Sequence, residues 1–113
     1  FRRYVASTTV LHPVEQARFY ESAKLFTRKS FAVMQGLDKL IENRPNLKRN
    51  YPLLILSGEK DVELALRSAK QWHDDEPDSH FYTIENAGHC ANMDNPARFN
   101  EILMKFLGRC SDR

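Results

Sequence analysis

The clearest hydrophobic pattern lies in the second half of the chain. Residues 53–56 are apolar without alternation, which is typical of a strand that is covered on both faces in a parallel sheet. We therefore expect strands at 53–57 and 80–84, and apolar positions at helical spacing predict a helix between them, from about Val62 to Trp72. Two strands joined by a helix form a right-handed βαβ unit, so both strands should end at the same edge of the sheet.

A last amphipathic helix is predicted after the second strand. Asn95 suits the N-cap and Pro96 the first helical position. Gly108 stands where a C-terminal cap glycine belongs, which would leave 109–113 as a loose tail. Asp94 is expected to support the start of this helix. Its buried face is predicted from five apolar residues: Phe99, Ile102, Leu103, Phe106 and Leu107.

The first half of the chain carries helical patterns only. Residues 1–12 are ambiguous, because a helix could run to Val10 or break at 7–9. One helix is predicted from Val14 to about Phe26, and another from about Ser30 to Asn43. The second has a regular apolar stripe: Val33, Met34, Leu37, Leu40 and Ile41.

The segment 73–78 is predicted to be a polar loop, with Pro77 as its stop signal. It follows Trp72, which we expect in the core together with Phe81 and Tyr82. A stacking platform for ligands is the less favoured interpretation of these three aromatic residues.

Composition adds bounds to this picture. A chain of 113 residues forms one domain or less, and its 42% hydrophobic and 28% charged residues are those of a soluble globular protein. No apolar run approaches the roughly 20 residues of a membrane span. The start at Phe1, without Met or an apolar leader, suggests a piece of a longer protein. Cys90 and Cys110 are too few for a disulfide framework, which makes a cytoplasmic location the default.

Charge is divided unevenly along the chain. Residues 1–50 hold ten Lys or Arg and four Asp or Glu, a net +6, whereas residues 51–113 hold seven and eleven, a net −4. A basic half can indicate nucleic-acid binding. Here the cations are dispersed along helical patterns, which favours solvated helix faces, so we expect neither nucleic acid nor a membrane as a partner.

Candidate chemistry comes from two residues that follow the two strands. Asp61 alone would be a helix N-cap, and His89 alone an ordinary loop histidine. Adjacent parallel strands lie about 4.8 Å apart, so loops that leave their carboxyl ends can bring the two side chains within hydrogen-bond reach. A carboxylate paired with an imidazole is two thirds of a hydrolytic triad.

The motifs around these residues resemble the C-terminal part of an α/β-hydrolase. A strand ending in Gly-x-x-Asp is matched by 58–61, a strand ending in Gly-His by 88–89, and an acidic residue before Asn-Pro and a helix by 94–96. The resemblance covers 51–107. It implies an incomplete α/β-hydrolase fold with a helical lid-like segment at 1–50 and a C-terminal βαβα part at 51–113. An ordinary pair of sheet-covering helices is the alternative for the first segment.

The resemblance implies that Asp61 is the acid and His89 the base of a triad in a parent enzyme that hydrolyses an ester, amide or related bond of a small molecule. It implies no cofactor. The Gly-x-Ser-x-Gly elbow of the nucleophile does not occur, since Ser57 and Ser79 lack the flanking glycines. Two alternatives remain open: a non-catalytic binding or scaffold protein of the same fold, and a small interaction module in which Asp61 only caps a helix.

Other candidates are weaker. Cys90 directly follows His89, and sequence neighbours usually point their side chains apart, so a Cys-His dyad is not expected. A metal site from His73, Asp74, Asp75 and His80 fits no zinc spacing.

A sheet of only two strands leaves edges and apolar faces uncovered. We therefore expect self-association, a missing N-terminal half that covers the sheet edge, or marginal stability.

Overall fold

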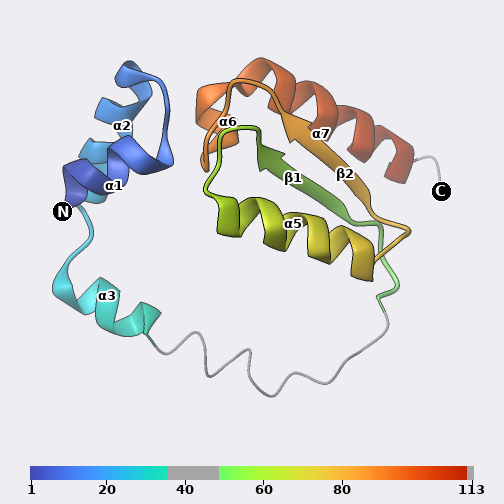
Figure 1. The fold of residues 1–113 in the computed structure, drawn as a ribbon, viewed down its shortest axis with the longest axis horizontal. Coiled ribbons are helices and arrows are strands. Elements are labelled where there is room, and N and C mark those ends of the chain that lie inside the picture. Colours follow the sequence, from blue (N-terminus) through green and yellow to red (C-terminus); the bar gives the residue numbers. More distant parts are fainter. Residues whose placement is uncertain (36–48, 112–113) are drawn as a thin grey trace.

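The computed structural model describes residues 1–35 and 49–111 of the chain. Its centre is a two-stranded parallel sheet in which β1 (Leu54–Gly58) pairs with β2 (His80–Ile84) (Figure 1). The register places Leu54 opposite His80 and Gly58 opposite Ile84. Both predicted strands and the α/β class are confirmed, with β1 shifted by one residue from 53–57.

The helices α5 (Glu63–Asp75) and α7 (Pro96–Ser111) cover opposite faces of this sheet (Figure 1). The short helix α6 (Ala91–Asp94), which the sequence did not predict, precedes α7. The core lies on the α7 side of the sheet. It consists of Ile84, Ala87, Ala91 and Ile102, with Leu54, Leu56, Tyr82 and Phe99 packed against them.

The start of α7 is as expected, and its end is not. The side-chain oxygen of Asn95 accepts a hydrogen bond from the Arg98 N–H at 3.2 Å, which confirms the N-cap. Gly108 does not end the helix, because the helix continues to Ser111 and no described glycine has a positive φ. Of the predicted apolar face only Ile102 is buried, and Leu107 is exposed. Residues 112–113 lie outside the described residues.

The helix α5 runs three residues beyond the predicted end at Trp72, to Asp75. Side-chain pairs four residues apart stabilise the extra turn: Lys70 Nζ lies 2.6 Å from Asp74, and Gln71 Nε2 lies 2.9 Å from Asp75. The expected core position of Trp72 is wrong, since it is 55% exposed. The described residues supply no strand beyond β1 for Trp72 to pack against.

The described residues of the N-terminal part form three helices: α1 (Arg2–Thr9), α2 (Pro13–Ala23) and α3 (Arg28–Met34). The serine and threonine run does not break α1. The Ser7 and Thr8 hydroxyls donate to the Tyr4 carbonyl at 2.9 and 3.0 Å, so both are satisfied within the helix. The helix predicted to begin at about Ser30 starts at Arg28. The rest of that predicted helix from 36 to 43, with Leu37, Leu40 and Ile41, lies outside the described residues.

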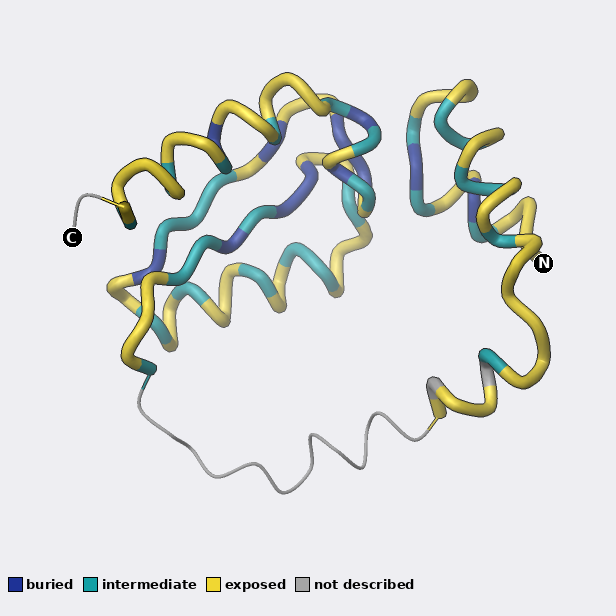
Figure 2. Tube along the Cα trace, turned by 180° about the vertical axis from the view of Figure 1, so that it is seen from behind, coloured by how far each residue is buried: buried dark blue, intermediate teal, exposed yellow. Residues whose placement is uncertain are grey.

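Burial is concentrated where the N-terminal part approaches the strand ends. Figure 2 shows buried segments at the ends of both strands, in the loops that follow them and in the α1–α2 connection. Val10 in that connection is completely buried. The outer sides of α5 and α7 are mostly exposed. Within the described parts of the chain, no helix combines the length and the apolar character that a membrane span requires.

Candidate active site

The loops that follow β1 and β2 are hydrogen-bonded to each other. The Glu59 N–H donates to the Ile84 carbonyl at 2.9 Å, and the Lys60 N–H donates to the Ala87 carbonyl at 2.8 Å. Parallel strands end at the same edge of a sheet, which is why these two loops can meet. The first loop carries Asp61 and the second carries His89.

Gly58 makes this meeting possible. A Cβ atom at position 58 would lie 2.0 Å from the Gly88 carbonyl oxygen and 2.5 Å from that of Ala87. No side chain fits at these distances from backbone atoms. The glycine of the Gly-x-x-Asp pattern is therefore required by the close approach of the two loops.

The structure brings Asp61 and His89 together as expected. His89 Nδ1 lies 3.1 Å from Asp61 Oδ1 and 3.0 Å from Asp61 Oδ2. The Asp61 side chain is only 6% exposed, whereas the His89 side chain is 59% exposed. Asp61 is not the N-cap of α5, because Val62 occupies that position and no side chain caps the helix.

The pair can carry out acid-base chemistry. A carboxylate is an acceptor, so it selects the imidazole tautomer that has its proton on Nδ1. Nε2 is then unprotonated and can accept a proton. Nε2 has no hydrogen-bond partner among the residues that the structure describes. The arrangement is that of a histidine base oriented by an acid.

A groove of about 480 Å³ runs from this pair along β1. Asp61 and His89 line one end of it, and Ala65 and Trp72 of α5 line one side. Ser57 also lines the groove, and its buried Oγ has no hydrogen-bond partner within the described ranges. Buried hydroxyls are normally satisfied. The groove thus follows the edge of β1 that no strand covers in the described residues.

Asp94 has a role that the sequence did not reveal. Its Oδ1 accepts hydrogen bonds from the Leu11 N–H at 2.8 Å and the His12 N–H at 3.1 Å, and its Oδ2 accepts one from the Gly88 N–H at 2.9 Å. The expected support of the last helix is wrong, since none of these donors belongs to α7. Two of the three donors lie more than 80 positions away in sequence, so no local pattern could have identified them.

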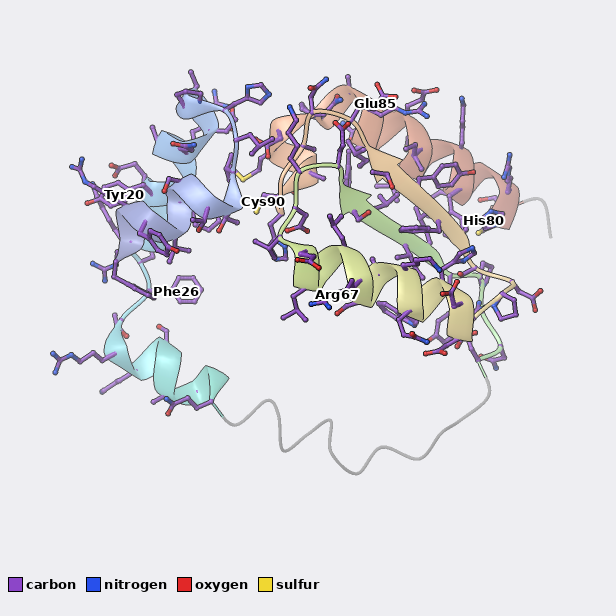
Figure 3. The ribbon with its side chains drawn as sticks, viewed as in Figure 1. Tyr20, Phe26, Arg67, His80, Glu85 and Cys90 are labelled. Carbon is purple, nitrogen blue, oxygen red and sulfur yellow. The ribbon has the colours of Figure 1, made fainter. Side chains whose placement is uncertain are left out.

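Cys90 lies between the α1–α2 part and the strand ends, as Figure 3 shows. Its N–H donates to the Thr9 carbonyl at 3.1 Å. Burial, and then the charges of Asp94 and Asp61, raise the pKa of the Cys90 thiol. A raised pKa keeps the sulfur protonated and weakly nucleophilic. This favours the interpretation of Cys90 as a packed side chain.

The four residues considered for a metal site belong to separate interactions. His73 Nδ1 lies 2.7 Å from Ser79 Oγ, and the His80 ring contacts the Phe106 ring edge-on, with centroids 5.6 Å apart. Asp74 and Asp75 pair with other residues of α5. Across residues 1–35 and 49–111, no group of three or more histidine, cysteine or acidic side chains could hold a metal ion.

Known proteins resemble this chain over different lengths. Uncharacterised proteins from Mycobacterium bovis and Mycobacterium tuberculosis are 37% identical to it over 65 residues, which is 58% of this chain and 19% of theirs. The crystal structure of a provisionally assigned hydrolase from Bacillus subtilis matches 92% of this chain with a TM-score of 0.57 and 24% identity. No family model matches the chain.

The structural match covers only 39% of the Bacillus subtilis protein, and the chain spans about a fifth of the length of the curated relatives that it matches. The two parallel strands with their flanking helices therefore resemble part of a hydrolase fold. The resemblance seen in the sequence is confirmed at the level of the fold.

Proposed function

We propose that His89 and Asp61 are the base and the acid of a hydrolytic triad whose nucleophile lies outside these 113 residues. The observation that carries the proposal is the contact of His89 Nδ1 with both oxygens of the shielded Asp61 carboxylate, at 3.0 and 3.1 Å. The similarity to part of a hydrolase fold supports the same proposal.

The proposed mechanism uses each nitrogen of His89 differently. Nε2 accepts the proton of the nucleophile as the nucleophile attacks the carbonyl carbon of an ester, amide or related group. Asp61 holds the Nδ1–H and stabilises the imidazolium that results. The proton on Nε2 then passes to the leaving group. Water hydrolyses the covalent intermediate by the same route, with His89 again acting as the base.

In this proposal the described residues supply only part of the enzyme. The groove beside β1 is the place where a strand from the remainder of the sheet would pair, and Ser57 Oγ would find a partner there. Residues 1–50 would form a helical lid-like segment over a small-molecule substrate. An alternative partner for the free edge is a second copy of this chain, which sedimentation would reveal as a dimer.

The test uses the full-length protein and a panel of p-nitrophenyl esters. Asp61→Asn should lower kcat by about ten-thousand-fold and His89→Ala by about a million-fold, the sizes of effect seen when a triad loses its acid or its base. The control is His73→Ala, which removes a histidine bonded to a buried serine at the other end of the sheet. Its turnover should match that of the unaltered protein.

Unchanged turnover in His89→Ala would overturn the proposal. A fluorophosphonate probe adds a readout that needs no substrate, because it labels an activated serine. Failure of every ester and of the probe on the full-length protein, together with retained ligand binding, would instead favour a non-catalytic member of the fold.

A further inference from the structure

Asp94 is a buried carboxylate beside the base, and the proposed proton transfers do not use it. It is 7% exposed. Its two oxygens together accept three backbone N–H groups, two from the α1–α2 connection and one from the loop that carries His89. Hydrogen bonds to an ionised acceptor are roughly twice as strong as those between neutral groups. Asp94 is therefore a strong attachment point between two distant segments.

The backbone on both sides of His89 is held by this arrangement. Before His89, the Gly88 N–H donates to Asp94 Oδ2 at 2.9 Å. After it, the Cys90 N–H donates to the Thr9 carbonyl at 3.1 Å. The His89 ring is more than half exposed, so packing does not hold it. The position of its backbone decides where the ring can meet Asp61.

The fit at Gly88 shows how closely the segments lie. A Cβ atom there would be 3.2 Å from the Thr9 carbonyl oxygen, 3.3 Å from Asp94 Oδ2 and 3.3 Å from a side-chain carbon of Leu11. These distances are tighter than ordinary van der Waals contact. Residues 9–12 are thus pressed against the loop at the residue just before the base.

We infer that Asp94 is a positioning residue for His89, which fixes the loop that carries the base by fastening residues 9–12 to it. The inference rests on the proposed catalytic role of His89. It assigns to the connection between α1 and α2 a function in the site, although that connection is far from the base in sequence. Residues 9–12 together with Asp94 and Gly88 are called the clasp below.

The first test is Asp94→Asn in the full-length protein. Asparagine has one acceptor oxygen and a donor in place of the other, so it cannot satisfy all three N–H groups. We expect kcat to fall by about 10- to 100-fold with KM unchanged, because a base displaced by about 1 Å loses rate at that scale. Glu101→Gln is the matched control. It neutralises an exposed carboxylate that is bonded to Arg98 and Lys105, and it should leave kcat unchanged.

A double-variant cycle separates positioning from general damage to the fold. If Asp94 acts through His89, adding Asp94→Asn to His89→Ala should cause no further loss of turnover. The same fractional loss in both backgrounds would overturn the inference. Full activity of His89→Ala would instead overturn the proposed function. Loss of activity in His89→Ala with normal kcat in Asp94→Asn would remove the positioning role alone.

A second variant attacks the clasp from its other side. Leu11→Pro deletes one N–H that donates to Asp94 and leaves residues 88–90 unaltered. Val10 is already extended, with φ −126° and ψ 136°, as a residue before proline should be. We expect a smaller fall in kcat in the same direction, and faster amide exchange at Gly88 and His12. Unaltered exchange at Gly88 in both variants would contradict the inference without reference to activity.

Discussion

The acid and the base leave the same edge of the sheet, but their two loops are held in different ways. The acid loop, residues 59–62, is held by neighbours in the same βαβ unit. The Glu59 and Lys60 N–H groups donate to carbonyls at the end of β2 and just after it, and the Asp61 N–H donates to the Gly58 carbonyl at 3.2 Å. The side chain of Asp61 is largely buried in this arrangement.

The base loop, residues 85–90, shares the bond from the Lys60 N–H to the Ala87 carbonyl, and it is also bonded to segments outside that unit. Asp94 in α6 and Thr9 at the end of α1 hold the peptide groups on the two sides of His89. The acid loop is thus held within the βαβ unit alone, whereas the base loop has additional bonds on both sides of His89, to Asp94 and to Thr9. The two loops should therefore respond differently to substitutions of equal size.

The largest effect is expected at Gly58, which lies where the loops touch. Alanine there would place its Cβ 2.0 Å from the Gly88 carbonyl oxygen, and backbone atoms cannot give way cheaply. Gly58→Ala should lower the free energy of unfolding by about 3 kcal/mol or more, the upper range for forced overpacking. Urea unfolding measures this change. Catalysis in the full-length protein should be lost as well, because the acid and base separate.

The matched control for that substitution is Gly108→Ala. A Cβ at Gly108 would have no neighbour within 4 Å, and the residue lies inside α7. Alanine should stabilise the helix by about 0.5–1 kcal/mol, since glycine is costly in a helix interior. Destabilisation at both glycines would mean that Gly58 is not special.

A smaller loss is expected at Gly88, in the base loop. Its hypothetical Cβ meets the Thr9 carbonyl, the Asp94 carboxylate and Leu11 at 3.2–3.3 Å, and the two side chains can shift. Gly88→Ala should destabilise by about 1–2 kcal/mol, clearly less than Gly58→Ala. Amide exchange, measured separately, should be faster at Leu11 and His12. A larger loss than at Gly58 would reverse the order proposed for the two loops.

The comparison also explains what the sequence could predict. The acid loop follows from local signals: an unbroken apolar strand, a Gly-x-x-Asp turn and an amphipathic helix. Because the partners of Asp61 follow from consecutive elements, its meeting with His89 could be expected. The N-cap at Asn95 is local for the same reason, since it depends on residues only three positions apart.

The parts that could not be predicted depend on contacts between distant segments of the chain, or on packing partners that the described residues do not supply. Asp94 bonds to residues that carry no side-chain signal, because the donors are backbone N–H groups. Trp72 lies on an apolar stripe that normally faces a core, yet it is exposed at the edge of β1 for which the described residues supply no further strand. Gly108 looks like a helix cap in sequence, but it lies inside α7 without the positive φ of a cap glycine.

The two buried serines provide a test of the strand that carries the acid loop. Ser57 Oγ has no partner in the described part of the chain, whereas Ser79 Oγ lies 2.7 Å from His73 Nδ1. In the 113-residue chain, Ser79→Ala should cost about 1 kcal/mol and Ser57→Ala should be neutral or stabilising. In the full-length protein, Ser57→Ala should become destabilising if a further strand satisfies the hydroxyl. Equal losses in the short and long chains would argue against a covering strand at β1.

The smallest expected effect concerns Cys90, which lies beside both carboxylates. Its pKa is raised by burial first, by Asp94 second and by Asp61 third. Replacing either carboxylate with its amide removes a negative charge that opposes thiolate formation, so the pKa of Cys90 should fall. The fall should be larger for Asp94→Asn than for Asp61→Asn, since Asp94 contributes more than Asp61 to the raised pKa of Cys90.

Alkylation by iodoacetamide as a function of pH measures this difference in a Cys110→Ser background, where Cys90 is the remaining thiol. Glu101→Gln serves as the control, because that carboxylate is not among the causes of the raised pKa of Cys90. In urea all variants should titrate alike, which would show that the shift belongs to the folded state. A larger fall of the Cys90 pKa in Asp61→Asn than in Asp94→Asn would contradict this prediction. It would mean that Cys90 lies closer to the charge of the acid loop than to Asp94.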